Sequence, residues 1–295
     1  MADKPKSPDK SGFIQVENGT RKVYWEYFGR GDREVIVLLN GLAMLTRSWY
    51  RTVPFLYPEF DVLLYDYFGQ GQSSQEDEPY YIANLAGYLI QIMDQLGIEK
   101  IHPIGVSYGG FIAADLGRLF QDRLHTLTLS GILLTRSTQF QMYQDLSLRF
   151  YHEPEPSFEL YTHYLYEKIF SEEFASRIYG EAMEIGREKF YDRYKDRKYC
   201  LVRLTEAQDP FFEIIDSDQD AYRNIKTPTL ILTGAQDRAI PGWHQAKLLD
   251  IIPNSRQILL PSSGHMTYME RPDIFWPAVR SFFRAKSTDF MFSES

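Results

Sequence analysis

Residues 100–110 read Lys-Ile-His-Pro-Ile-Gly-Val-Ser-Tyr-Gly-Gly, and this stretch decides the fold. Its first part, 100–106, is an apolar run typical of a strand buried on both faces of a parallel sheet. Residues 108–120 that follow predict a helix. Ser107 between them lies in a Gly-x-Ser-x-Gly pentapeptide, so this strand–turn–helix has the form of a nucleophile elbow. We therefore predict Ser107 as a catalytic nucleophile, with a serine in an ordinary glycine-rich turn as the alternative reading.

Strands and helices alternate on both sides of this stretch. That alternation is typical of an α/β domain with a mostly parallel central sheet flanked by helices. Two short strands at 13–16 and 22–28, turning at Asn18-Gly19, open the chain. Further strands are predicted at 34–39, 62–65, 126–130, 229–233 and 257–260, and helices at 49–56, 82–96, 244–251 and 274–284.

The alternation stops near residue 134 and resumes near residue 226. We expect a core of residues 12–133 and 226–285, with a helical cap of residues 134–225 inserted after the sixth strand. Residues 1–11 and 286–295 are expected to be tails. The cap is rich in Phe and Tyr at helical spacing, which either pack it onto the core or line an apolar pocket.

Composition excludes several classes of protein. The net charge is −8, which disfavours nucleic acid as a partner. No apolar run is long enough for a membrane-spanning helix. Cys200 is the only cysteine, so no internal disulfide forms, and the polar N-terminus lacks the apolar core of a secretory signal. We expect a cytoplasmic protein, and the chain has no motif for a metal or an organic cofactor.

A serine nucleophile needs a base and an acid that orients the base. His265 follows the last predicted strand, on a loop at the carboxyl edge of the sheet, where sites form in parallel sheets. Asp237 is the only carboxylate in the loop after the strand at 229–233, and it precedes the histidine in the chain. The alternatives are a structural or surface histidine, and an aspartate that caps a turn or pairs with Arg238.

The oxyanion of an acyl-transfer reaction needs preorganised donors. We predict that two backbone N–H groups are these donors: that of Tyr108, directly after the nucleophile, and that of Leu42 in the loop 40–44. The alternative is that this loop is a plain strand-ending turn. Side chains expected to contact the substrate are those of Asn40, Met44, Tyr143, Trp243 and Met266.

These motifs resemble those of the α/β-hydrolase superfamily, in the right order over residues 12–285. Residues 66–73 are similar to the Asp-x-x-Gly-x-Gly-x-Ser turn of that family, which is structural. The serine nucleophile argues against the dehalogenases and epoxide hydrolases of this fold, which use aspartate. Two features depart from the pattern: Asn40-Gly41 replaces the usual His-Gly of lidded relatives, and Pro103 lies in a predicted central strand.

The resemblance implies a lidded serine esterase that cleaves carboxylic esters with an apolar acyl group, without a cofactor. A weaker similarity is to the acyltransferase that joins two 3-hydroxyacyl units in rhamnolipid biosynthesis, so acyl transfer or thioester cleavage is an alternative. A non-catalytic ligand-binding protein is a third. Seven basic residues against three acidic ones at 187–203 could dock an acyl-carrier protein or a coenzyme, or simply form a solvated helix face. The oligomeric state is not predicted.

Overall fold

The computed structural model describes residues 7–218 and 220–292. Its centre is an eight-stranded sheet with the order β1-β2-β4-β3-β5-β6-β7-β8. The first two pairings, β1 with β2 and β2 with β4, are antiparallel, and the others are parallel. The predicted fold class is confirmed. The strands are β1 Lys10–Val16, β2 Arg21–Phe28, β3 Val35–Leu39, β4 Asp61–Tyr65, β5 Ile101–Val106, β6 Leu127–Ser130, β7 Thr229–Gly234 and β8 Ser255–Leu260.

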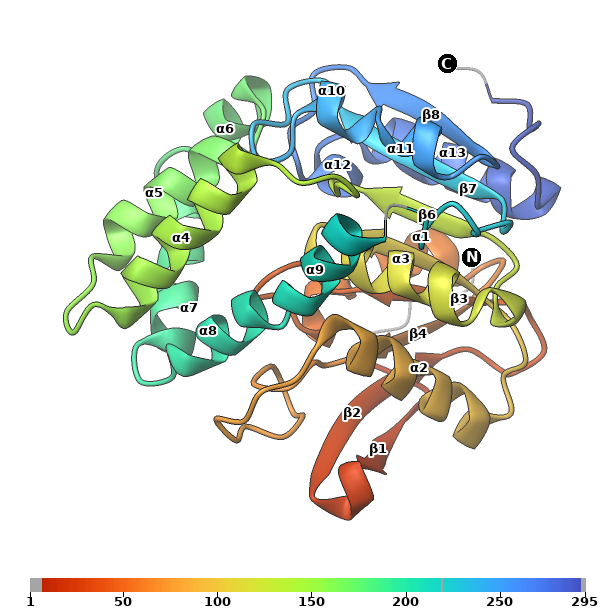
Figure 1. The fold of residues 1–295 in the computed structure, drawn as a ribbon, viewed down its shortest axis with the longest axis horizontal. Coiled ribbons are helices and arrows are strands. Elements are labelled where there is room, and N and C mark those ends of the chain that lie inside the picture. Colours follow the sequence, from red (N-terminus) through yellow and green to blue (C-terminus); the bar gives the residue numbers. More distant parts are fainter. Residues whose placement is uncertain (1–6, 219, 293–295) are drawn as a thin grey trace.

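Helices cover both faces of the sheet (Figure 1). The side chains of β3 and β5 are buried throughout because apolar helices lie against both faces. One face packs on α2 (Ile82–Leu96), α3 (Tyr108–Leu119) and α11 (Leu248–Ile251). The other face packs on α1 (Val53–Leu56), α12 (Thr267–Glu270) and α13 (Pro272–Ala285).

The segment between β6 and β7 is helical, and we keep the name cap for residues 134–225, the boundaries proposed from the sequence. Figure 1 shows the greater part of it, in green, at one end of the sheet. Its helices are α4 Thr138–His152, α5 Phe158–Ile169, α6 Glu172–Ile178, α7 Glu181–Tyr194, α8 Tyr199–Glu206 and α9 Asp209–Ser217. Among the described helices, none has the length and apolarity that crossing a bilayer requires.

Pro103 does lie in a central strand, and the pairing pattern explains how β5 tolerates it. The parallel ladder between β5 and β6 starts at Ile104 and Thr128. An isolated bridge between Ile101 and Leu124 precedes it. Pro103 therefore lies in a gap between the two, where no partner on β6 requires its missing N–H.

The expected tails are shorter than predicted. Lys10 and Ser11, assigned to a tail, pair with β2 as the first residues of β1, while residues 1–6 lie outside the described range. At the other end, Phe290 is 4% exposed and packs against the ring of Phe282. The Arg256 guanidinium also donates a 2.6 Å hydrogen bond to the Phe290 carbonyl. Burial of this aromatic ring attaches the segment to the core at Phe290, and residues 293–295 lie outside the described range.

The helix predicted at 244–251 is two short helices, α10 (Gly242–Gln245) and α11. The short helix α12, directly after His265, was not predicted from the sequence. Four residues are too few to show a helical hydrophobic period, so only the packing of α12 in the fold reveals it.

Candidate active site

Ser107 stands at the carboxyl end of β5, at the start of α3. Its backbone has φ 54° and ψ −123°, a conformation that costs free energy in a residue with a side chain and clusters at functional sites. Tight packing imposes this turn. A Cβ atom added to Gly105 would lie 2.5 Å from the Gly109 carbonyl oxygen, and one added to Gly109 would lie 2.3 Å from that of Leu39. Neither position has room for a side chain, so both flanking residues must be glycine.

His265 and Asp237 lie side by side on the loops after β8 and β7. Nδ1 of His265 is 2.8 Å from Oδ2 of Asp237, and both residues are buried. The other carboxylate oxygen, Oδ1, accepts the backbone N–H groups of Ala239 at 2.9 Å and Ile240 at 2.8 Å. The side-chain amide of Gln245 donates to Oδ2 at 3.0 Å. The Asp237 carboxylate is therefore held in one orientation, with Oδ2 towards the imidazole.

The alternative ion pair between Asp237 and Arg238 does not form. The Arg238 guanidinium points to the cap, where Nε lies 3.0 Å from a carboxylate oxygen of Glu167. The turn-capping role of Asp237 does exist, since Oδ1 accepts two N–H groups of its own loop. Oδ1 of Asp237 thus caps the turn, while Oδ2 contacts the imidazole of His265.

Two opposing effects act on the pKa of His265. Burial lowers it, because a charged imidazolium loses solvation in the interior. The negative charge and the hydrogen bond of Asp237 raise it, and so does the charge of Glu270. The carboxylates prevail, so the pKa lies above its ordinary value of 6.5. The site therefore stabilises the cation that forms when the imidazole accepts a proton.

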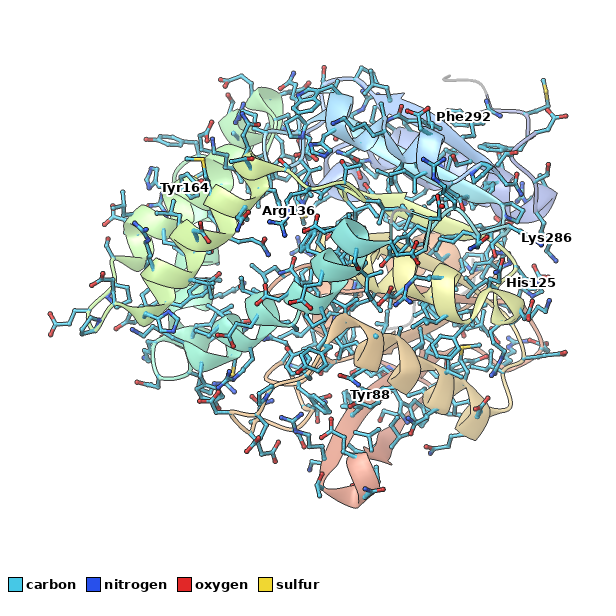
Figure 2. All side chains as sticks on the ribbon, in the orientation of Figure 1. Tyr88, His125, Arg136, Tyr164, Lys286 and Phe292 are labelled. Atoms are coloured by element: carbon cyan, nitrogen blue, oxygen red, sulfur yellow. The ribbon has the colours of Figure 1, made fainter. Side chains whose placement is uncertain are left out.

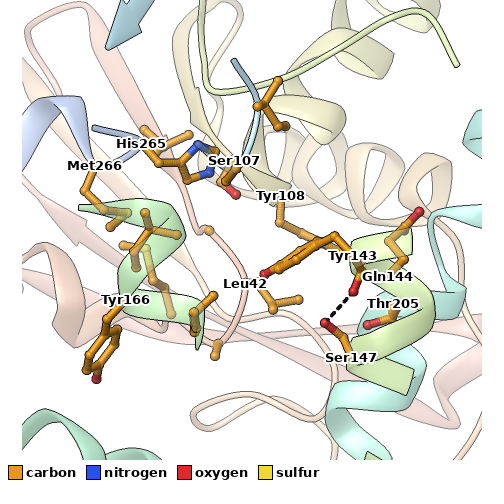
Figure 3. A pocket seen from close by; sticks show the side chains of 18 of the residues that line it. Leu42, Ser107, Tyr108, Tyr143, Gln144, Ser147, Tyr166, Thr205, His265 and Met266 are labelled. Carbon is orange, nitrogen blue, oxygen red and sulfur yellow. Dashed lines mark hydrogen bonds between the residues drawn. The ribbon is translucent and has the colours of Figure 1, made fainter. Parts of the chain in front are cut away.

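Ser107 and His265 line the same cavity, which has a volume of about 270 Å³. Figure 3 shows their side chains next to each other at one end of it. Within the described residues, no direct hydrogen bond joins these two side chains, as is common in unliganded sites that tighten on binding. Gly131 makes room for the imidazole: a Cβ atom there would lie 2.6 Å from Cε1 of His265.

The loop 40–44 forms another wall of this cavity, to which it contributes Leu42, Ala43 and Met44. Ala43 has φ 61°, a left-handed conformation that turns the loop sharply. The backbone N–H groups of Leu42 and Tyr108 donate to no other described residue. Both predicted oxyanion donors therefore border the cavity with an unused N–H.

Comparisons with known proteins show which family this fold belongs to. The family model described as alpha/beta hydrolase fold matches residues 34–272. The chain belongs to the alpha/beta hydrolase family.

The similarity to known proteins covers most of the length of this hydrolase. A protein of Caulobacter sp. (strain K31) named "Putative carbamate hydrolase RutD" is 25% identical over 88% of this chain and 95% of its own length. Among solved structures, MGS-M2, an alpha/beta hydrolase enzyme from a deep-sea metagenome library of the Medee basin, has a TM-score of 0.84 at 26% identity, covering 95% of this chain and 100% of its own. The enol-lactonase of Burkholderia xenovorans LB400 has a TM-score of 0.74 at 23% identity, covering 92% and 100%. Family, fold and relatives together identify the chain as a hydrolase.

Of the five side chains predicted to contact the hydrolase substrate, Met44, Tyr143 and Met266 line the cavity. The prediction for Asn40 is wrong. Its side chain is fully buried, with Nδ2 donating to the Tyr65 carbonyl at 3.0 Å and Oδ1 accepting Nε1–H of Trp49 at 2.7 Å. Asn40 thus joins the start of the loop 40–44 to the end of β4 and to Trp49.

The prediction for Trp243 is also wrong. Its side chain is 60% exposed on α10, outside the cavity, with the Lys247 ammonium 5.3 Å from the ring centroid. Trp243 is the second residue of α10, whose buried side is formed by His244 and Gln245, so the Trp243 ring is left on the outer side. Its sequence position close to Asp237 did not indicate this.

Two other histidines lie far from this site. The ring centroids of His102 and His125 lie 4.9 Å apart with the rings tilted by 31°, and both rings face the carboxylate of Glu34. Figure 2 shows His125 and Lys286 at the end of the molecule away from the cap. Burial lowers the pKa of His102 to about 4 despite the carboxylate beside it.

Sequence reasoning missed Glu270, which is 5% exposed on α12. Its Oε2 accepts the backbone N–H groups of Gly264, beside His265, and of Ser171 in the cap, both at 3.0 Å. It also missed Gln245, which holds Asp237. The one signal for Glu270 was its distance of five residues from His265, and spacing alone does not show that a carboxylate is buried.

Proposed function

We propose that this alpha/beta hydrolase cleaves carboxylic esters with an apolar acyl group through an acyl-enzyme on Ser107. The observation that carries the proposal is the buried pair of His265 and Asp237, 2.8 Å apart, at the cavity that Ser107 lines. Aromatic and aliphatic side chains, among them Phe111, Phe140 and Ile240, line the same cavity and favour an apolar acyl chain.

Each proposed residue has one role. Nε2 of His265 takes the proton of Ser107, whose oxygen attacks the ester carbonyl. Asp237 keeps Nδ1 protonated and stabilises the imidazolium. The oxyanion of the tetrahedral intermediate accepts the N–H groups of Leu42 and Tyr108. His265 then protonates the leaving alkoxide, and water, activated by the same imidazole, releases the acid from Ser107.

A fluorophosphonate probe tests the nucleophile directly, because it modifies only an activated serine. We expect it to label the protein and to fail on the Ser107→Ala variant. The matched control is Ser130→Ala, which removes a buried hydroxyl on β6 that donates to the Leu232 carbonyl at 2.8 Å, and this variant should still be labelled. Labelling of Ser107→Ala at the rate of the unmodified protein would refute the proposal.

A series of p-nitrophenyl esters of increasing acyl length then measures the acyl preference. Product analysis in the presence of an added alcohol or a hydroxyacyl thioester separates hydrolysis from the alternative of acyl transfer, because transfer yields the new ester instead of the free acid.

The relative named as a carbamate hydrolase supports a second candidate substrate, a carbamate. A carbamate carbonyl undergoes the same attack by serine, with an amine or alcohol as leaving group. An aryl carbamate measured beside the matching aryl ester decides between them through the ratio of kcat/KM.

A further inference from the structure

The seven basic residues of 187–203 do not form one basic face. Five of them are bonded to acceptors that do not line the cavity of Ser107. Arg187 pairs with Glu184, Lys195 with Asp192, Arg197 with the Gln75 side chain, Lys198 with the Glu153 carbonyl, and Arg203 with Asp77 and Glu206.

The remaining two, Lys189 and Arg193, line the cavity that holds Ser107 and His265. They are four residues apart on α7, so they project from the same face of that helix. Neither forms an ion pair with a carboxylate among the described residues. No described Asp or Glu lines this cavity, so its wall contains two cationic residues and no carboxylate. Lys189 is exposed and Arg193 is half-buried.

Arg193 also reaches the loop 40–44. Its Nη1 donates a 2.7 Å hydrogen bond to the carbonyl oxygen of Ala43, the residue with the left-handed backbone. The guanidinium also lies 5.9 Å from the ring centroid of Tyr194, whose hydroxyl it contacts, and its charge acts on the carboxylate of Asp66. A guanidinium carries five N–H donors, so these contacts do not use all of them. The nearby carboxylate of Asp66 is buried, and its two oxygens accept the backbone N–H groups of Thr46 and Gln72.

We propose that the substrate of this site is an ester that carries a carboxylate, which Lys189 and Arg193 bind while the ester carbonyl lies at Ser107. A carboxylate offers two oxygens, and an ammonium beside a planar guanidinium supplies donors to both. The wall between these cations and Ser107 is largely apolar, which suits a short hydrocarbon spacer. This inference rests on the proposed function, because it names the substrate class of the same site.

A matched pair of esters tests it: mono-4-nitrophenyl glutarate, with a terminal carboxylate, and 4-nitrophenyl pentanoate, with a methyl group in its place. We expect kcat/KM of the unmodified enzyme to favour the glutarate ester by roughly tenfold, because charge-assisted hydrogen bonds to a carboxylate are stronger than neutral ones and solvent screening of the exposed Lys189 reduces the gain. The preference should fall as salt is added, because Lys189 is exposed and Arg193 is half-buried, so salt screens both charges.

Lys189→Gln and Arg193→Gln should each lower this ratio, and the double variant should abolish it. Lys195→Gln removes the same charge from the end of the same helix, outside the cavity, and should keep the ratio. Equal kcat/KM for the two esters in the unmodified enzyme would overturn the inference. Fluorophosphonate labelling of Ser107 in each variant shows that the site is folded. If the two esters give equal kcat/KM while Ser107 is still labelled, the carboxylate inference fails and the proposed function stands.

Calorimetric titration of the same two esters into Ser107→Ala repeats the test without turnover. Binding of the glutarate ester that is tighter than that of the pentanoate ester, and that is lost when Lys189→Gln is added, supports the carboxylate site. Equal binding of both esters overturns it.

Discussion

The backbone N–H of His265 donates a 2.7 Å hydrogen bond to the carbonyl oxygen of Ile169. This bond joins the loop after β8 to the cap, at the junction of α5 and α6. Glu270 spans the same junction, since its Oε2 accepts N–H groups from Gly264 and Ser171. The position of the imidazole is therefore coupled to the position of the cap, and a cap that moved here would move the proposed base.

The first prediction concerns Glu270→Gln. The substitution keeps the shape of the side chain but removes a negative charge that raises the pKa of His265. We expect the acid limb of the pH profile of kcat/KM to move to lower pH. We also expect kcat to fall by roughly an order of magnitude, because a slightly displaced catalytic group is costly.

Glu167→Gln is the matched control for Glu270→Gln. The carboxylate of Glu167 lies on the cap helix α5 and pairs with Arg238 of the loop after β7. It should leave the acid limb in place. An acid limb that stays in place in Glu270→Gln as well would contradict the coupling of this carboxylate to His265.

The second prediction is the pH dependence of the unmodified enzyme. The proposed base acts when it is neutral, and its pKa in the folded protein is raised above 6.5. Activity should therefore fall as the pH drops through that raised pKa. The sign for stability is opposite: the folded state favours the protonated imidazole, so this contribution is present at pH below 6.5 and is lost as the pH rises through the folded pKa. Measuring kcat/KM and urea unfolding over the same pH range checks both signs, and parallel trends would be inconsistent with them.

The third prediction is that Asp237→Asn lowers kcat by about four orders of magnitude, the loss expected when the histidine adopts the wrong tautomer. The amide can still accept the N–H groups of Ala239 and Ile240 through one oxygen, so the loop should keep its fold. Steady-state kinetics with a p-nitrophenyl ester, beside a circular dichroism melt, separates lost catalysis from lost structure. A loss below tenfold would show that Asp237 does not orient the base.

The fourth prediction separates Asn40 from Trp243. Asn40→Ala leaves the Trp49 Nε1–H and the Tyr65 carbonyl without partners in the interior, which should cost about 1–3 kcal/mol of unfolding free energy for each. Trp243→Ala removes an exposed ring and should change the unfolding free energy by less than about 0.5 kcal/mol. Urea unfolding of both variants measures the difference, and equal values would contradict the burial of Asn40.

The local sequence was sufficient for the elements that carry the candidate site. Apolar runs predicted the strands β3, β5 and β7, because a strand covered on both faces must be apolar throughout. The serine turn could be predicted because close contacts within a few residues, and with the adjacent strand β3, require its two glycines. Asp237 and His265 were found because parallel strands end at one edge of a sheet, so the loops after β7 and β8 had to be neighbours.

Tertiary structure alone decided which way side chains outside that edge point. Asn40 is the first residue of the loop 40–44, yet its side chain turns inward, because buried Trp49 and Tyr65 supply partners from other elements. Lys189 and Arg193 are two cations among seven, and only the packing of α7 over the cavity distinguishes them from the rest. Long-range packing sets these directions, and the residues next to a side chain in the sequence do not indicate what lies opposite it in a cavity. The sequence by itself therefore determined the strands and where they end. The tertiary structure determined which side chains form the cavity walls.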